Sequence, residues 1–325
     1  MTHAPSADWL AELTRFDPAK AIDDPPSWDD AAPFLSRHGL AGIAAYNLQY
    51  RMPFARAPEA VKDMLLGHMQ GISGDTIFKL MTLKNLVGTL EGRQVVLLDG
   101  AAFGETLYPH IAFRPVPELR LLVAPKDVEP IELAMRGAQF FEMDSEEPDP
   151  DGPAKVLFND RFFVKLYAHL LPHAAAEPGL LERAIPAKAL GAGVFRLEAE
   201  DALLVHVLSM ARRGFVVPLM YFVDLRQMVV GEGPPMLGRG PGAPLDREVV
   251  LSRAKAFGVE RALWASMELT AYFHPDVAEK AKALQPELGL PIRKVLETAV
   301  IHPAKELERE RQLRGVGKLV QLLIG

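Results

Sequence analysis

The pattern of apolar and polar residues predicts helices toward both ends of the chain and short strands in its middle third. Residues 28–48 and 59–90 carry apolar residues at the spacing of amphipathic helices. Residues 94–98, 119–123 and 161–168 are short and rich in aliphatic and aromatic residues, which is typical of strands. Strands gathered between helical segments indicate an α+β protein rather than a doubly wound parallel sheet. On the second helix, the predicted apolar side consists of Ile77, Leu80, Met81, Leu83 and Val87.

The second half of the chain is predicted to be mainly helical. Residues 198–213 form its clearest amphipathic helix, with acids in the first turn, arginines in the last and Gly214 directly after it as a stop signal. The pattern therefore divides the chain into three parts. We expect an N-terminal helical segment over residues 1–92, an α/β core over residues 93–195 and a helical C-terminal domain over residues 196–325.

Two segments interrupt these elements. Residues 143–153 combine acids, prolines and a glycine, and residues 231–246 contain five glycines and four prolines. Neither composition sustains a helix or a central strand. Both segments are therefore expected to be exposed loops.

Composition and charge narrow the class of protein. The 325 residues include 36 lysines and arginines against 42 acids, a formal net charge of −6, which argues against nucleic acid as the main partner. The absence of cysteine excludes disulfides, thiolate zinc sites and a cysteine nucleophile. The longest apolar stretch, residues 215–223, is too short to span a bilayer, and the N-terminus does not resemble a signal peptide. We therefore expect a cytoplasmic protein without a membrane span.

Charged residues on two of the predicted strands form the most informative pattern. Because side chains alternate between the two faces of a strand, Glu118 and Arg120 share one face, while the opposite face is apolar. On the third predicted strand, Lys165 shares its face with Phe163 and Tyr167. From the residues alone, these charges either solvate a sheet edge or mark a ligand site.

Residues 95–123, with the sequence VVLLDGAAFGETLYPHIAFRPVPELRLLV, carry a recognisable motif. They resemble the signature region of a largely uncharacterised bacterial nucleotidyltransferase family within the DNA polymerase beta-like superfamily. In that family an apolar strand leads into Lys-Gly-Ala, then a helix ending in Leu-Tyr-Pro, then Arg-Pro, and then Asp-x-Asp before Leu-Leu-Val. The similarity extends over residues 28–230. It implies a small mixed nucleotidyltransferase-like sheet flanked by helices, with a mainly helical C-terminal half.

The resemblance also implies three acids that hold two divalent metals, which bind a triphosphate and help to activate an attacking hydroxyl. Glu118 stands at the first of these positions, but Arg120 stands at the second and Lys165 at the third. Asp99 stands where the family has a lysine before the glycine. Since an unpaired charge in a cleft is costly, this exchange of signs suggests that the two bases lie where the metals would lie and are neutralised by the two acids. The alternative is a solvated charged cleft without a purpose.

Functions from three classes follow from this exchange. The preferred one is a catalytically inactive, nucleotidyltransferase-like regulatory module that binds a nucleotide or phosphate through Arg120, Lys165 and the backbone amides around Gly100, without a metal or another cofactor. The second is an active transferase that uses Glu118 with Asp99 or another acid, together with Mg²⁺ and ATP, to move a nucleotidyl group to a hydroxyl. The third is a structural protein-interaction module. The candidate binding residues are Asp99, Gly100, Ala101, Arg114, Arg120 and Lys165.

Three histidines are considered as chemical groups. His169 and His173 have the spacing of a helical zinc pair, but Pro172 lies between them and no third ligand is evident. A surface turn is therefore favoured for this segment. His206 is favoured as a residue at the edge of the core or facing solvent rather than as a general base.

Two features lie further along the chain. Asp224 follows an apolar run and is expected to pair with Arg212 or Arg213 across a helix–helix contact, as a structural ion pair before a substrate contact. Residues 305–325 are densely charged at first and apolar at their end. The apolar end is expected to dock on the same chain, with a homodimer or protein-partner contact as the next alternative.

Overall fold

The computed structural model describes residues 6–16, 25, 27–51, 57–90, 92–143, 149–231 and 245–301. These residues form the α+β arrangement predicted from the sequence: a seven-stranded mixed sheet flanked by helices, with helices dominating the C-terminal half. The strands are β1 (Val95–Leu97), β2 (Glu118–Val123), β3 (Phe141–Glu142), β4 (Lys155–Phe158), β5 (Phe163–Tyr167), β6 (Ile185–Pro186) and β7 (Val194–Arg196).

The three predicted strands lie side by side in this sheet, whose order is β3-β4-β5-β2-β1-β7-β6. β2 is parallel to β5 and β1 is parallel to β7, and the other pairs are antiparallel. The register of β2 with β5 places Arg120 directly beside Lys165. Two neighbouring cations on one face repel each other unless carboxylates lie close to them.

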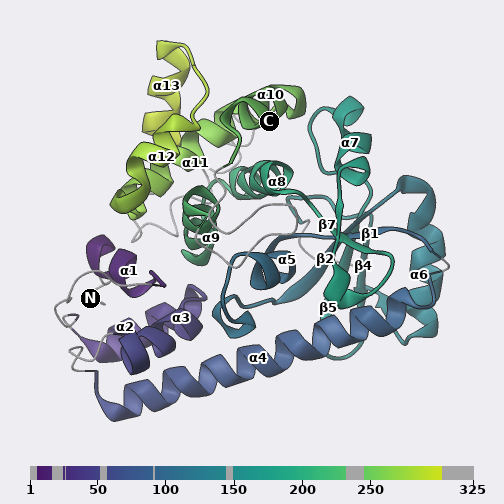
Figure 1. Cartoon of the computed structure of the whole chain (residues 1–325), viewed down its shortest axis with the longest axis horizontal. Helices are drawn as coiled ribbons and strands as arrows, with labels where there is room; N and C mark the ends of the chain where they lie inside the picture. The colour runs from purple at the N-terminus through teal and green to yellow at the C-terminus, as the bar shows by residue number, and fades with distance from the viewer. Residues whose placement is uncertain are drawn as a thin grey trace.

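The helices cover the sheet from several sides. Figure 1 shows α4 running along one side of the molecule, α8 near the centre with α9 beside it, and α10 to α13 gathered at the side away from α4. The helices of the first half are α1 (Ala7–Leu13), α2 (Trp28–Arg37), α3 (Ala41–Tyr46), α4 (Glu59–Val87), α5 (Asp99–Thr106) and α6 (Val128–Gly137). Those of the second half are α7 (Glu177–Glu182), α8 (Ala199–Arg212), α9 (Met220–Val230), α10 (Arg247–Phe257), α11 (Glu260–Phe273), α12 (Ala278–Ala283) and α13 (Leu290–Leu296).

The predicted helix over residues 28–48 is instead two helices, α2 and α3. Gly39, between them, has a φ of +75°, a left-handed conformation that ends a right-handed helix. The glycine also lies close to Met220, so its lack of a side chain allows the chain to turn against α9.

The apolar side predicted for α4 is partly wrong. Ile77 and Met81 are 50% and 52% exposed, whereas the other predicted residues of that side are buried. The helix instead turns Lys79 inward, where its Nζ lies 2.5 Å from the carbonyl oxygen of Val116. This buried ammonium shifts the packed face of α4 toward the loop before β2.

Helix α8 is predicted to be amphipathic, but it is buried on every side from Ala199 to Ala211. It packs against α9, α10 and α11. Its polar residues are therefore enclosed in the protein rather than solvated. His206 and Ser209 carry polar groups into the interior next to the sheet.

No helix among the described residues has both the length and the apolar character needed to cross a membrane. Residues 305–325 and most of the predicted loop at 231–246 lie outside the described residues, so the docking predicted for the end of the chain stays a prediction. The division into three domains also stays a prediction.

A buried histidine in the helical half predicts a stability that depends on pH. Burial lowers the pKa of His274 to about 3, and the charge of Arg226 acts in the same direction, whereas Asp276 opposes it. The unfolded chain takes up this proton near its ordinary value of about 6.5, but the folded chain does not, so stability falls as the pH drops from about 6.5 toward 3. Over this range, this one group should lower the free energy of unfolding by about 1.4 kcal/mol for each unit by which the pH falls.

Urea unfolding of the wild type and of His274→Gln between neutral and mildly acidic pH measures this slope. The variant is expected to lose the contribution, while His68→Gln, which alters an exposed histidine, should keep it. Equal slopes in the wild type and His274→Gln would contradict the prediction.

Candidate functional site

Arg120 lies at the centre of the charged cleft beside α5. Its guanidinium forms an ion pair with Asp99, lies 2.5 Å from Asp151 Oδ2 and donates through Nε to the Tyr167 hydroxyl oxygen at 3.0 Å. Burial alone would lower the pKa of Arg120, but the charges of Asp99 and Asp151 raise it well above its ordinary value. All three guanidinium nitrogens therefore have partners, and Arg120 stays charged.

Lys165 forms the second part of the cleft. Its Nζ lies 2.7 Å from Glu118 Oε2 and 2.6 Å from Asp149 Oδ2. Burial opposes its charge, but the hydrogen bonds to Asp149 and Glu118 raise the pKa of the ammonium above its usual value. The predicted pairing of two bases with two acids is thus confirmed: Arg120 with Asp99, and Lys165 with Glu118.

Further charges in the cleft were not predicted. Residues 149–153 belong to the segment expected to be an exposed loop, yet Asp151 is only 4% exposed. Its Oδ2 also accepts from Arg213 Nη1 at 2.6 Å, and its Oδ1 lies 3.6 Å from Arg212 Nη1. Within the described residues, four acids and four bases thus balance each other. This ionic cluster consists of Asp99, Glu118, Asp149, Asp151, Arg120, Lys165, Arg212 and Arg213.

Asp99 is the first residue of α5 and has a φ of +46°, a conformation that aspartate tolerates better than most residues. Burial would raise the pKa of Asp99, but the charge of Arg120 and the nearby imidazole of His206 hold it well below its usual range. His206 is fully buried, with Nδ1 3.5 Å from Asp99 and its ring stacked on Tyr221. The expectation that His206 faces solvent or the edge of the core is therefore wrong.

Arg114 forms a second buried ion pair beside the ionic cluster. Its Nη2 lies 2.8 Å from Asp224 Oδ2, and Tyr108 donates its hydroxyl to Asp224 Oδ1 at 2.6 Å. Asp224 was expected to hold Arg212 or Arg213, and that pairing is wrong because the two arginines at the end of α8 approach Asp151 instead.

Gly100 allows Arg114 to take this place. A Cβ at Gly100 would lie 3.0 Å from Arg114 Nη1 and 3.2 Å from the carbonyl oxygen of Pro115. Asp224 fixes the guanidinium, so the arginine cannot move aside easily. The glycine and the arginine of the motif over residues 95–123 thus lie close together.

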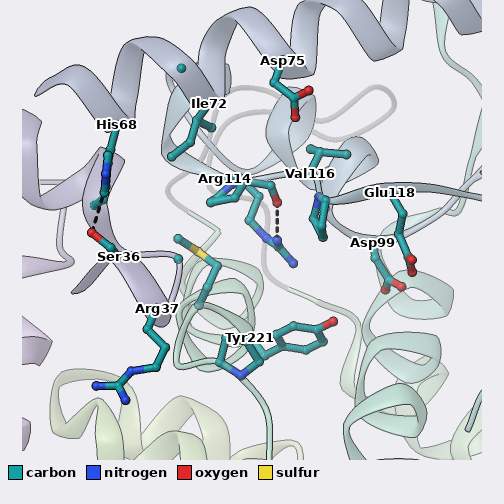
Figure 2. Close-up of a pocket in the computed structure, with 18 of the residues that line it drawn as sticks. Ser36, Arg37, His68, Ile72, Asp75, Asp99, Arg114, Val116, Glu118 and Tyr221 are labelled. Carbon is teal, nitrogen blue, oxygen red and sulfur yellow. Dashed lines mark hydrogen bonds between the residues drawn. The ribbon is translucent and has the colours of Figure 1, made fainter. Parts of the chain in front are cut away.

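A cavity of about 600 Å³ opens beside the ionic cluster (Figure 2). Helix α4 forms one wall, where His68, Ile72 and Asp75 lie, and Tyr221 of α9 lies across from them. A cavity of this volume can enclose a ligand of nucleotide size. Of the predicted site residues, Asp99, Gly100, Arg114, Glu118 and Arg120 line the cavity, whereas Ala101 and Lys165 do not.

Most charges around the cavity are already paired. Asp75 lies 2.5 Å from the buried Lys79, and the Ser36 hydroxyl lies 2.9 Å from His68 Nδ1. Arg37 is exposed at the end where α2 meets the cavity. Figure 2 shows Arg37 and His68 at one end, Asp99 and Glu118 at the other, and Arg114 between them.

Whether the cleft could hold a metal ion depends on the side chains that the structure describes there. Within the part of the chain that the structure describes, no group of three or more histidine and acidic side chains could hold a metal ion. The carboxylates of the ionic cluster are bonded to guanidinium and ammonium groups, which lie where a cation would have to bind. His169 and His173 are both exposed, and His173 Nδ1 lies 3.0 Å from the carbonyl oxygen of Ala256, which agrees with the predicted surface turn.

The strand that carries Glu118 and Arg120, the adjoining α5 and the helical half have the arrangement that the resemblance to a nucleotidyltransferase family implies. The model of a family described as an uncharacterised nucleotidyltransferase matches residues 24–275, and the chain belongs to this family. No curated protein and no solved structure matches the chain.

Proposed function

We propose that the chain is a nucleotidyltransferase-family protein without metal-dependent transfer, whose cavity binds a nucleotide or a related anion in a regulatory role. The observation that carries this proposal is the position of Arg120, which is bonded to Asp99 and Asp151 where the family resemblance places a metal-binding acid. The superfamily, the bacterial origin and the cytoplasmic location predicted from the sequence stay predictions.

The energetics of the ionic cluster support the proposal that the protein does not catalyse metal-dependent nucleotidyl transfer. Two-metal catalysis needs carboxylate oxygens that are free to bind the metals. A metal at this position would have to displace Arg120 and leave a buried guanidinium without its partners. Breaking a buried ion pair in this way costs about 3–5 kcal/mol, which opposes metal binding.

The same geometry changes the expected route of anion binding. Arg120 and Lys165 were predicted to accept the phosphate, but their nitrogens are occupied by protein acids. The first turn of α5, at Gly100, has no side-chain cap, and its backbone amides are suited to an anion. Arg37, at the far end of the cavity, adds a cation. We therefore place the ligand along the cavity between Gly100 and Arg37.

Isothermal titration of ATP with EDTA or with Mg²⁺, together with an assay for pyrophosphate release, tests the proposal. We expect similar affinity in both conditions and no pyrophosphate release above background. Gly71→Leu fills the cavity wall and should abolish binding. Gly74→Leu is the matched control, because Gly74 lies on the same helix with equally open space around it but does not line the cavity.

Two outcomes would overturn the proposal. Binding that needs Mg²⁺, together with pyrophosphate release, would identify an active transferase. No binding of ATP in either condition would favour the protein-interaction module.

A further inference from the structure

The turn formed by residues 149–152 carries two carboxylates into the ionic cluster. Asp149 accepts the backbone N–H of Asp151 at 2.9 Å through Oδ1, and its carbonyl oxygen accepts the N–H of Gly152 at 3.0 Å. Gly152 has a φ of +63°, which a glycine adopts without strain. The turn is therefore a defined local structure that holds both aspartates on the same side.

The donors around Asp151 resemble an oxyanion site. Its Oδ2 accepts from Arg120 Nη2 at 2.5 Å, Arg213 Nη1 at 2.6 Å and the Ser209 hydroxyl at 3.1 Å. Its Oδ1 is buried and has no hydrogen-bond partner among the described residues. Two guanidinium donors on a single oxygen are the kind of contact that phosphate oxygens make.

The charge balance depends on this turn. With Asp149 and Asp151 removed, the ionic cluster, as defined from the described residues, keeps its four bases but only two acids, Asp99 and Glu118. A formal excess of two positive charges would then remain. Lys165 and Arg213 are 18% and 21% exposed, so the excess would lie within reach of solvent.

We propose that this turn is an internal counter-anion: Asp149 and Asp151 fill a polyphosphate site made by Arg120, Lys165, Arg212 and Arg213, and an external polyanion binds there only by displacing the turn. The inference rests on the proposed function, since it assumes that the cleft binds anions without a metal. The turn adds an autoinhibitory contact to the proposed function. The contact is electrostatic, because each aspartate is held mainly by ion pairs, so a more highly charged anion can compete with it.

Titration of inorganic tripolyphosphate in EDTA into the wild type and into Asp149→Asn/Asp151→Asn tests this inference. The double variant should bind at least about tenfold more tightly than the wild type, because a turn without its two charges is held less strongly by the cations and is displaced more easily. Glu132→Gln/Glu142→Gln is the charge-matched control. It removes two acids from the ion pairs of Lys155 and Arg136, outside the ionic cluster, and should leave the affinity near that of the wild type.

Circular dichroism establishes that each variant is folded. If the double variant does not fold, Asp149→Asn alone removes one of the two acids bonded to Lys165 while it leaves the more deeply buried Asp151 in place, and a smaller gain in affinity is expected. Adding Lys165→Met to Asp149→Asn should remove the gain in affinity. A folded Asn variant that binds tripolyphosphate no more tightly than the charge-matched control would overturn the inference.

This result is separate from the test of the proposed function. Gly71→Leu blocks the cavity but does not touch the turn. If ATP does not bind the cavity while the Asn variant gains affinity for tripolyphosphate, the proposed function fails and the turn inference stands. If ATP binding is blocked by Gly71→Leu and the Asn variant gains nothing, only the turn inference fails.

Discussion

Replacement of Arg120 by methionine is expected to lower the free energy of unfolding by about 3–5 kcal/mol, since it removes one partner of a buried ion pair. Asp99 and Asp151 have side chains that are only 6% and 2% exposed, and both are bonded to Arg120. Arg213 remains near Asp151 and His206 remains near Asp99, so neither acid loses every contact. Urea unfolding at neutral pH measures the cost.

Arg136→Met is the matched control for this loss. Arg136 also contacts two acids, but its side chain is 54% exposed, so the cost should not exceed about 1 kcal/mol. Adding Asp99→Asn and Asp151→Asn to the Arg120 variant should recover much of the loss, because the two buried carboxylates that lost Arg120 are then neutral. A cost no larger than that of Arg136→Met would show that Arg120 does not hold the cluster together.

The pH dependence gives a second readout of the same variant. In the wild type, Arg120 helps to hold the pKa of Asp99 below its unfolded value of 3.8, so this stability is present above that pH and is lost below it. Without Arg120, burial raises the pKa, and protonation relieves the stranded charge. The deficit of the variant should therefore narrow as the pH falls from neutral toward about 4.

The core of the sheet was predictable from local pattern. β1, β2 and β5 are the strands whose runs of apolar residues are long enough to show a β pattern. β3 and β6 have only two residues each and gave no such signal. The position of Lys79 was also hidden, because a lysine in a helical pattern is assigned to the solvent side, whereas this one is bound by backbone carbonyls.

The site was predictable where its charged residues lie on neighbouring strands or directly after a strand. Glu118 and Arg120 share a strand, and Lys165 lies on its parallel neighbour, so their signs alone indicated pairing. Asp151 could not be found in this way. It pairs with Arg213, 62 residues later, and acids among prolines and a glycine are typical of a solvated loop.

The partner of Asp224 could not be predicted from the sequence either. The sequence indicated that it needs an arginine, and it has one, but the partner is Arg114, 110 residues earlier, rather than an arginine of the preceding helix. Contacts of this separation depend on how the segment between α5 and β2 packs against α9. The close approach of Arg114 to Gly100 is visible only in three dimensions.

Asp224→Asn should cost about 3–5 kcal/mol, because the amide leaves the guanidinium of Arg114 buried without a counter-charge. Asp224 is fully buried and also accepts the Tyr108 hydroxyl, which the asparagine oxygen can still accept, so the loss isolates the charge. Glu59→Gln, in an exposed pair with Lys62, makes the same chemical change and should cost at most about 1 kcal/mol. Urea unfolding compares the two, and Arg114→Gln added to Asp224→Asn should restore part of the stability by removing the unpaired charge.

Because Arg114 lines the cavity beside Gly100, Asp224→Asn alone should also bind ATP more weakly than Glu59→Gln. Equal costs for Asp224→Asn and Glu59→Gln would mean that the buried pair does not hold this wall of the cavity in place.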